Sequence, residues 1–420
     1  MGLAAHSSYD SYKDSGEGWI EDVPAHWEIR KLKHLFQEKK HRQNLDLNCG
    51  SISFGEVVEK DDERVPLATK ASYQEVSKGE FLVNPLNLNY DLKSLRIGLS
   101  DIDVVVSAGY LVLQAKDEMD KRYFKYLLHR YDVAYMKLLG SGVRQTISFN
   151  HIANSILVAP PLPEQRAIAA FLDDKCAKID GAVRIKEDQI TLLRERRQII
   201  IQDAVTRGLN PAAPMKDSGI DWIGQIPAHW ENMPNKYLFR LKKDTVGKRS
   251  AEYDLLSLTL RGVIKRDMEN PEGKFPAEFD TYQEVCPGDF VFCHFDVEET
   301  PRTVGLSEFF GMITGAYTVY SVAQGVDPRF LLHFYIFADT DKKMRSMYKG
   351  LRNTIPKDAF AAFKTPLPPI EEQRAIVAHI DDASQKIEDG IAIKERQIAA
   401  LKEYKTSLIN AAVTGKIKVI

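Results

Sequence analysis

The sequence predicts an α/β (α+β) protein of two homologous domains, each followed by a long helix, with the two helices paired as an antiparallel coiled coil. Two observations indicate this fold class. The stretch GWIEDVPAHWE at residues 18–28 returns as DWIGQIPAHWE at 221–231, and EQRAI at 164–168 returns at 372–376. After each EQRAI, apolar residues recur at alternating spacings of three and four, which is typical of coiled-coil helices. The chain is therefore a duplication of one unit about half its length.

The repeat also sets the predicted domain boundaries. GVRQTI at 142–147 returns as GLRNTI at 350–355, so the similarity extends through each domain. Prolines at 160–163 and 366–369 separate the variable regions from the helices, because proline cannot continue a strand ladder but is tolerated at a helix start. We predict a first domain at 1–160, a first helix at 161–208, a second domain at 209–369 and a second helix at 370–420.

Each domain is predicted to mix short strands with helix. The runs SISFGEVV (51–58) and VVVSAGYLVL (104–113) are rich in β-forming residues, as are 257–264 and 312–320 of the second copy. An amphipathic helix is predicted from Tyr123 to Leu139. Turn residues lie between these runs, so each domain is expected to be α/β with several short strands.

The long helices carry a predicted seam of apolar side chains. Its residues are Leu172, Ile179, Val183, Ile190, Leu193, Ile200, Ile380, Ile387, Ile391, Ile398, Leu401 and Leu408. Basic residues interrupt the seam at matching places, Lys186 and Arg197 in the first helix and Lys394 and Lys405 in the second. Such interruptions fix register or partner choice at a cost in stability. The alternative is that these long side chains only extend out of the seam into water.

Connectivity constrains how the helices pair. The first helix leaves the first domain and enters the second through the short linker 208–214, and the second helix starts from the second domain. If the helices pack on each other, the second must run back, so the pair is antiparallel. The stretch from Ile168 to Ala204 would be about 55 Å long at 1.5 Å per residue. We expect a dumbbell in which an approximate two-fold axis relates the two domains.

Composition excludes several classes of protein. The 420 residues include 57 Lys and Arg against 59 Asp and Glu, and none of the four segments has a marked basic excess. A protein that held nucleic acid alone would normally show such an excess. No stretch approaches the length of a membrane span, and the N-terminus does not resemble a secretory signal. The four cysteines match no zinc motif, so we expect a reduced, cytoplasmic chain with no metal.

No catalytic motif is found. The chain lacks a phosphate loop, a zinc constellation and a dinucleotide fingerprint, and Asn84-Pro85-Leu86 is an incomplete match to the motif of amino-methyltransferases. Asp173-Asp174 and Asp381-Asp382 lie near helix starts, where the helix dipole explains them. Basic residues follow each PAHWE motif; a solvated face and phosphate contacts explain them equally well. We predict a protein that is not an enzyme.

These motifs together closely resemble the specificity subunits of type I DNA restriction–modification systems. The residues that carry the resemblance are the KDSG…WI…IPAHWE start of each half, the PLP…EQRAI helix opening and the AVT at each helix end. The resemblance implies two target-recognition domains, each of which reads one half of a bipartite asymmetric DNA site. It also implies that the helices set the spacer between the half-sites and dock methyltransferase subunits.

The resemblance further implies the partners and cofactors. They are double-stranded DNA, two methyltransferase subunits, and restriction subunits that act as ATP-dependent translocase and nuclease. S-adenosylmethionine, ATP and Mg²⁺ would be used by these partners, with no cofactor and no catalytic residue in this subunit. A basic excess would not be needed here, since the methyltransferase subunits would also hold the DNA.

The predicted DNA contacts are polar and basic residues of the variable regions and basic patches. They are Lys31, Lys40, Arg42, Arg64, Arg96, Arg144 and Asn150 in the first copy, and Lys243, Arg249, Arg261, Lys265, Arg266, Arg302 and Arg352 in the second. Arg144 and Arg352 are matched, which suits a shared backbone or structural role. One alternative is a coiled-coil scaffold that binds only proteins; DNA binding by the assembled complex would exclude it. The other is a self-contained nuclease–methyltransferase, which would require catalytic motifs.

Overall fold

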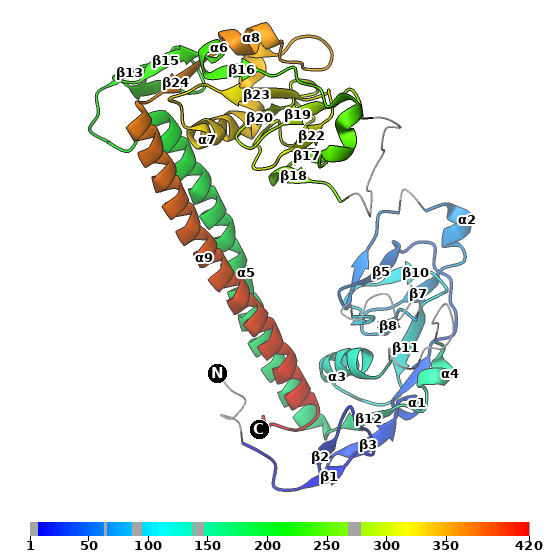
Figure 1. The fold of residues 1–420 in the computed structure, drawn as a ribbon. Helices are drawn as coiled ribbons and strands as arrows, with labels where there is room; N and C mark the ends of the chain where they lie inside the picture. Colours follow the sequence, from blue (N-terminus) through cyan, green and yellow to red (C-terminus); the bar gives the residue numbers. More distant parts are fainter. Residues whose placement is uncertain are drawn as a thin grey trace. The chain divides into compact units, whose positions relative to one another are not determined.

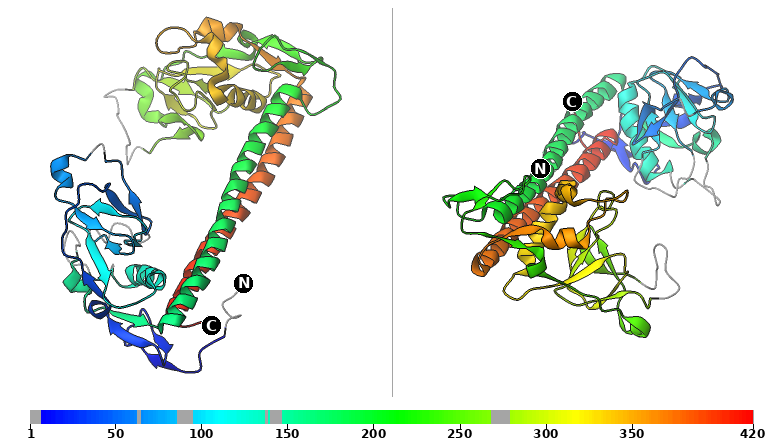
Figure 2. Two further views of the ribbon diagram at one scale, coloured as in Figure 1. Left: turned by 180° about the vertical axis from the view of Figure 1, so that it is seen from behind. Right: turned by 90° about the horizontal axis from the view of Figure 1, so that it is seen from above.

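The computed structural model describes residues 7–62, 65–85, 95–136, 139, 147–267 and 279–419 (Figures 1 and 2). The chain forms two compact units. Unit 1 combines Met1–Lys186 with Glu395–Ile420, and unit 2 is the continuous stretch Glu187–Lys394. Two long helices, α5 (Leu162–Arg207) and α9 (Ile370–Val413), each contribute one part to each unit. The predicted segments treat each long helix as one undivided segment, whereas the boundary between the compact units falls within both helices.

The centre of unit 1 is a six-stranded sheet. Its order is β4-β11-β8-β9-β6-β5, and the pairing of β6 with β9 is parallel while the others are antiparallel. In that order the strands are β4 (Phe36–Glu38), β11 (Leu111–Ala115), β8 (Phe81–Val83), β9 (Ile97–Leu99), β6 (Glu56–Glu59) and β5 (Gly50–Ser53). Helix α3 (Lys121–Ala134) packs beside β9 and buries Tyr123, Phe124 and Leu127.

Smaller elements complete unit 1. Three antiparallel pairs are β1 (Tyr12–Asp14) with β2 (Asp22–Pro24), β3 (Glu28–Lys31) with β12 (Ile156–Ala159), and β7 (Gln74–Val76) with β10 (Val104–Val106). The short helices are α1 (Leu32–Leu35), α2 (Leu67–Lys70) and α4 (Phe149–Ile152). The pair β3–β12 joins the two ends of the globular part, so the variable region between them forms one closed domain.

Unit 2 repeats this plan. Its four-stranded sheet has the order β16-β23-β20-β21, and the strands are β16 (Phe239–Leu241), β23 (Thr318–Val322), β20 (Phe290–Phe292) and β21 (Val304–Leu306). The antiparallel pairs are β13 (Met215–Asp217) with β14 (Gln225–Pro227), β15 (Glu231–Pro234) with β24 (Lys364–Leu367), β17 (Leu256–Thr259) with β18 (Gly262–Lys265), and β19 (Gln283–Val285) with β22 (Gly311–Ile313). The helical elements are α6 (Asn235–Leu238), η3 (Gly247–Glu252), α7 (Pro328–Asp339), η4 (Thr340–Met347) and α8 (Lys357–Ala362).

The long helices pack against each other in an antiparallel direction within each unit (Figures 1 and 2). In unit 1 the Lys405 ammonium donates to Asp180 at 2.7 Å, and in unit 2 Arg197 pairs with Glu388. Both ion pairs join a basic seam residue to an acidic residue beside the opposite seam. Two of the four basic interruptions, Lys405 and Arg197, therefore have specific acidic partners.

The predicted seam residues lie buried or half-buried. Those that are buried are Leu172, Ile179, Val183, Ile190, Ile380, Ile387, Ile391 and Leu408, and those that are half-buried are Leu193, Ile200, Ile398 and Leu401. Leu172, Ile179, Val183 and Leu408 also belong to the core of unit 1. The helices are thus part of each domain's hydrophobic core.

The echoed EQR motif fixes the start of each long helix. In unit 1 the amide of Gln165 donates to the Pro160 carbonyl at 2.8 Å and accepts the backbone N–H of Asp120 at 2.9 Å. Gln373 makes the same two contacts in unit 2, to Pro368 and Asp327. Since Asp120 and Asp327 are the N-caps of α3 and α7, one glutamine connects the starts of two helices.

The echoed PAHWE motif lies against the same helix start. Glu164 is buried and accepts hydrogen bonds from Tyr9 and from His26 Nε2, the latter at 2.9 Å. In unit 2 Glu372 accepts from His229 Nε2 at 2.7 Å and from Trp230 Nε1 at 3.1 Å. The two echoed motifs therefore contact each other, and both serve the fold of the domain.

These features confirm the predicted fold class of two homologous α/β domains with two long helices. Among the described residues, no helix combines the length and apolar character that crossing a membrane requires. In the same part of the chain, no three His, Cys, Asp or Glu side chains lie together as metal ligands would.

Candidate nucleic-acid interface

Three of the seven predicted contact residues of unit 2 lie at the hairpin β17–β18. Arg261 lies at its two-residue turn, Lys265 ends β18 and Arg266 follows it. Arg261 and Lys265 are exposed, and Arg266 is half-buried. Lys265 also lies over the Phe309 ring, 5.6 Å from its centroid. The hairpin therefore brings together three cations that are close in the sequence.

A groove lies between this hairpin and the sheet. Its volume is about 400 Å³, and it is lined by the hairpin residues 260–264, by β21 and by Leu332 and Ile336 of α7. Arg261 and Arg302 border it together with Glu308. The groove thus combines apolar walls with two guanidinium groups, which can donate to planar acceptors such as base edges or phosphates.

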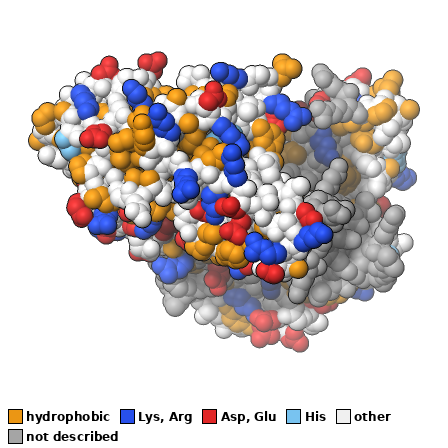
Figure 3. Space-filling view, turned by 45° about the horizontal axis from the view of Figure 1, so that its top comes forward, with side chains coloured by type: hydrophobic (Ala, Val, Ile, Leu, Met, Phe, Trp, Pro, Cys, Tyr) orange, Lys and Arg blue, Asp and Glu red, His pale blue; other side chains and the backbone are white. Residues whose placement is uncertain are grey.

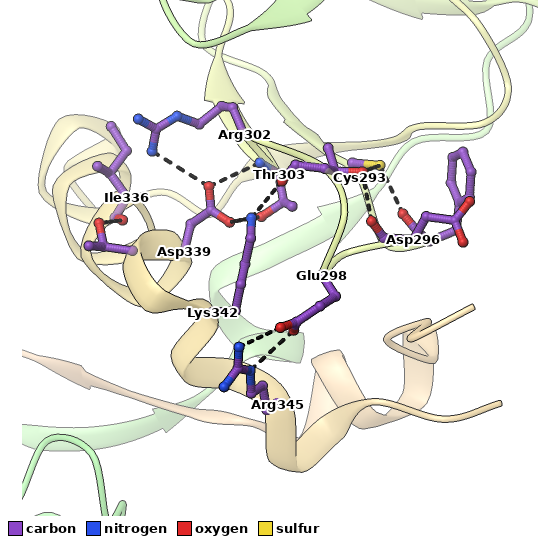
Figure 4. Close-up of polar contacts among 12 residues, drawn as sticks. Cys293, Asp296, Glu298, Arg302, Thr303, Ile336, Asp339, Lys342 and Arg345 are labelled. Carbon is purple, nitrogen blue, oxygen red and sulfur yellow. Dashed lines mark hydrogen bonds and ion pairs between the residues drawn. The ribbon is translucent and has the colours of Figure 1, made fainter. Parts of the chain in front are cut away.

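Arg302 is held by a buried acidic residue. Its NH1 lies 3.5 Å from Asp339, which also accepts from the Lys342 ammonium at 2.7 Å and from the Thr303 hydroxyl at 2.6 Å (Figure 4). Asp339 is buried at the end of α7. This network joins β21 to α7, so Arg302 has a structural role in addition to any contact with a ligand.

The second exposed region of unit 2 is the loop that contains Arg352. Lys349 and Thr354 exchange backbone hydrogen bonds of 2.8 and 3.0 Å, and the Asp296 N–H donates to the Arg352 carbonyl at 2.8 Å. The side chains of Leu351 and Arg352 are exposed. The backbone of the loop is thus fastened while its side chains extend outward. Its counterpart in unit 1, with Arg144, lies outside the described residues.

Lys243 and Arg249 lie elsewhere on unit 2. Both are exposed, and the Arg249 guanidinium lies over the Tyr253 ring, 5.6 Å from its centroid. Tyr253 stacks on Phe310 with a centroid distance of 4.9 Å. The neighbouring Lys242 differs, because it donates to Asp289 at 2.7 Å inside the domain. Burial alone would lower the pKa of Lys242, but the hydrogen bond to Asp289 and the charge of that carboxylate outweigh burial and raise it.

The candidates of unit 1 are more dispersed. Lys31 is exposed in β3, Lys40 is exposed after β4, and Asn150 is exposed in α4. Arg42 is exposed and its Nε lies 3.5 Å from Glu75. Arg96 is only 9% exposed and precedes β9, so in this structure its position suits a role in the fold. Arg64 lies outside the described residues.

On the face that Figure 3 presents, the described residues form no continuous basic field. Figure 3 shows basic, acidic and apolar side chains interspersed on the face that it presents. This agrees with a formal net charge of −2. Sequence reasoning selected charged residues and so missed large apolar side chains that are exposed at loop tips, Phe54 and Leu260 among them. In the sequence, only one feature indicates these two residues: each is apolar and stands next to a glycine or an arginine in the middle of a β-rich run.

One flank of the long helices is apolar and exposed. On α5, Ile185, Leu192 and Ile199 recur every seven residues, each one position before a seam residue. On α9, Ile393 has the corresponding place. In an antiparallel pair these positions lie on the same side of the two helices. Within unit 2, Leu192 and Ile393 are 62% and 44% exposed, so the pair presents an apolar flank there.

The opposite flank is polar. Arg184, Thr191 and Gln198 of α5 recur at the same interval and are exposed. The two sides of the helices therefore differ in chemistry although both are open to solvent. A third helix would therefore bury more apolar area of α5 on the side of Leu192.

Comparison with known proteins shows which proteins this chain is similar to. Residues 24–188 match the model of the type I restriction modification DNA specificity domain. The chain is 24% identical to a putative type I restriction enzyme MjaX specificity subunit of Methanocaldococcus jannaschii, over 95% of this chain and 96% of that protein. It is 22% identical to the MjaVIII specificity subunit of the same organism, over 75% of each.

Solved structures show the same fold. A chain from a structure described as the basis of complex assembly and conformational transition of the type I R-M system matches with a TM-score of 0.63, at 14% identity, over 93% of this chain and 98% of that chain. The HsdS subunit of Thermoanaerobacter tengcongensis matches with a TM-score of 0.51, at 16% identity, over 94% and 98%.

Proposed function

We propose that this chain, which belongs to the specificity subunits of type I restriction–modification systems, reads one half of a bipartite asymmetric DNA site with each of its two domains. DNA sequence recognition is the function of this family, and its specificity subunits are not catalytic. The division of the site between the domains, the role of the helices and the docking of partners are our proposals.

The observation that carries this proposal is the pattern of matched and unmatched residues in the two units. The buried contacts of Gln165 and Gln373, and of Glu164 and Glu372, are the same in both. The exposed hairpins β5–β6 and β17–β18 have different side chains. Two copies of one scaffold with different exposed residues suit two unlike half-sites, because base contacts specify sequence while the scaffold only positions them.

The long helices would set the spacer between the half-sites. A continuous helix has a fixed rise per residue, and its contribution to the core of both units resists a change in length. Insertion of one heptad into both helices at matching places should therefore lengthen the spacer without changing either half-site. Methylation sites mapped in cells that carry the variant would measure this, and an altered half-site would contradict the proposal.

We place the docking of methyltransferase subunits on the apolar flank of the helices. The exposed Leu192 is a suitable anchor, because a partner helix would bury it. Leu192→Glu should weaken assembly with the methyltransferase at least about tenfold, the equivalent of one large side chain. Thr191→Glu, on the opposite flank, is the matched control. Equal effects of the two substitutions would remove this assignment.

The complex would supply what this chain lacks. S-adenosylmethionine, ATP and Mg²⁺ would be used by the methyltransferase and restriction subunits. With no net positive charge, the isolated chain should bind DNA weakly and with little selectivity. Addition of the methyltransferase should give tight, site-selective binding with a steep dependence on salt. Fluorescence anisotropy with and without the partner tests this, and tight selective binding by the chain alone at physiological salt would refute it.

A further inference from the structure

The hairpins β5–β6 and β17–β18 are the same element in the two units. In each, the register leaves a two-residue turn, Phe54-Gly55 in the first and Leu260-Arg261 in the second. The residue after each hairpin makes the same backbone contact, from the Lys60 N–H to the Cys49 carbonyl at 2.7 Å and from the Arg266 N–H to the Leu255 carbonyl at 2.8 Å. Phe54 and Leu260 therefore occupy equivalent positions.

Both turns present a large apolar side chain to solvent. Phe54 is 86% exposed and Leu260 is 67% exposed. Two-residue hairpin turns normally carry Asn, Asp or Gly. Phe54 also has a φ of +50°, a left-handed conformation that is unfavourable for a bulky side chain. An exposed and strained aromatic residue does not stabilise unit 1 by burial, so its presence requires another explanation.

Close packing fixes where each turn points. In unit 1, Gly98 of β9 lies against the Gly55 backbone, and a Cβ on Gly98 would come within 2.9 Å of the Gly55 carbonyl oxygen. In unit 2, a Cβ on Gly305 of β21 would come within 2.9 Å of Val263 in β18. These matched glycines allow β6 to lie close beside β9 in the sheet of unit 1, and β18 to lie close to β21 in unit 2. Each hairpin is therefore packed against a neighbouring strand, while the apolar side chain at its turn is exposed.

We propose that Phe54 and Leu260 are specificity-determining residues that each contact the C5-methyl group of a thymine, one in each half-site. This inference rests on the proposed function, because it assumes that the domains read DNA. A two-stranded ribbon fits the major groove, and the thymine methyl is the apolar group that base edges present there. The residues that follow Phe54 and Leu260 differ, with Gly55 and Glu56 in unit 1 and Arg261 and Gly262 in unit 2. The polar contacts around each methyl contact would therefore differ between the half-sites.

The test uses the complete complex with its methyltransferase, on its own mapped site. Each thymine of the first half-site is replaced singly by uracil, which removes only the methyl group. With the native chain, one replacement should weaken binding about fourfold, which is the contribution of one buried methyl group. With Phe54→Asn the same replacement should have no effect, while uracil in the second half-site should still act. Leu260→Ala should show the reverse pattern.

Phe54→Asn also separates this role from a structural one. Asn tolerates the left-handed conformation better than Phe, so the variant should melt at the same or a higher temperature while losing discrimination at one base pair. Val133→Asn, at an exposed apolar position on α3, is the matched control and should leave discrimination unchanged.

The outcomes are distinct. If the native complex selects no site, the proposed function fails. Two results would refute the inference about the hairpins and leave the proposed function standing. In the first, the complex selects a site, but substitution of Phe54 or Leu260 does not change the effect of any uracil replacement. In the second, Phe54→Asn weakens assembly with the methyltransferase and leaves base discrimination unchanged.

Discussion

A fragment of residues 1–208 should form an antiparallel homodimer. In the intact chain, the core of unit 1 is completed by the second helix, with Leu408, Val413 and Ile417 all buried. The fragment lacks these residues but has the corresponding stretch of the first helix, in which Ile200 and Val205 match Leu408 and Val413. Each fragment can therefore complete the core of the other.

The size of the effect follows from the replaced side chains. Burial of two large side chains contributes about 3–6 kcal/mol to each half of the dimer. The basic seam residues also find partners. Asp180 pairs with Lys405 in unit 1 and Arg197 with Glu388 in unit 2, so in the dimer Arg197 of each copy would lie at Asp180 of the other. The interruptions of the seam are thus compatible with a homodimer.

Asp180→Lys provides the decisive perturbation. In the dimer it would place like charges together twice, whereas in the intact chain it affects only the pair with Lys405. The side chains of Asp180 and Lys405 are 59% and 30% exposed, so solvent screens each pair and the two changes together should cost about 1–2 kcal/mol. Dimerisation of the fragment should therefore weaken about 5- to 30-fold.

Sedimentation equilibrium measures this directly. The native fragment should sediment as a dimer, the Asp180→Lys fragment should dissociate at higher concentrations, and the intact Asp180→Lys chain should remain folded. With methyltransferase subunits, the native fragment should methylate a palindrome of the first half-site. A fragment that stays monomeric and directs no methylation even with those subunits would show that the two halves are not interchangeable.

Three further predictions concern single units. Exchange of residues 30–144 for those of a relative should change only the first half of the methylated sequence, and a change in both halves would show that the domains do not act independently. Burial, and then the nearby Lys357, lower the pKa of His294 from 6.5 to about 4. As pH falls from 6.5 to 4, the unfolded chain therefore binds a proton at this histidine that the folded chain does not bind. The free energy of unfolding should fall by about 3 kcal/mol over that range. His294→Phe, which keeps the contacts with Phe292 and Phe360, should reduce this loss in urea unfolding at pH 7 and 5. Gly415→Ala and Gly219→Ala both place alanine at positive φ, which should cost each variant about 1–2 kcal/mol of stability. Only at Gly415 would the new Cβ also collide with Pro24, so the melting temperature of Gly415→Ala should fall further than that of Gly219→Ala. Equal shifts in melting temperature would contradict this.

The sequence predicts the long helices well, because their period is regular over many turns and prolines mark where they begin. It also identifies the echoed EQR and PAHWE motifs. It does not show what they do, since the contact of His26 with Glu164 joins residues far apart in the chain.

The candidate DNA contacts were less predictable, because exposure depends on tertiary structure. Arg302 has the charge expected of a contact residue, yet its guanidinium lies 3.5 Å from Asp339 within the domain. Arg96 is buried. Phe54, in contrast, belongs to a run that predicts an ordinary strand, and only the register of the hairpin places it at an exposed turn.

The division of the chain between the units has a consequence for synthesis on the ribosome. Unit 2 is continuous and can fold as soon as Lys394 has emerged, whereas unit 1 needs Glu395–Ile420 in addition to Met1–Lys186. At about 5–20 residues per second, the residues after Lys186 take on the order of 10–50 s to make. During that time the nascent first domain exposes the surface that Leu408, Val413 and Ile417 later cover. The domain that is translated first is therefore the last to be completed, and in the interval a chaperone or a neighbouring nascent chain can bind it.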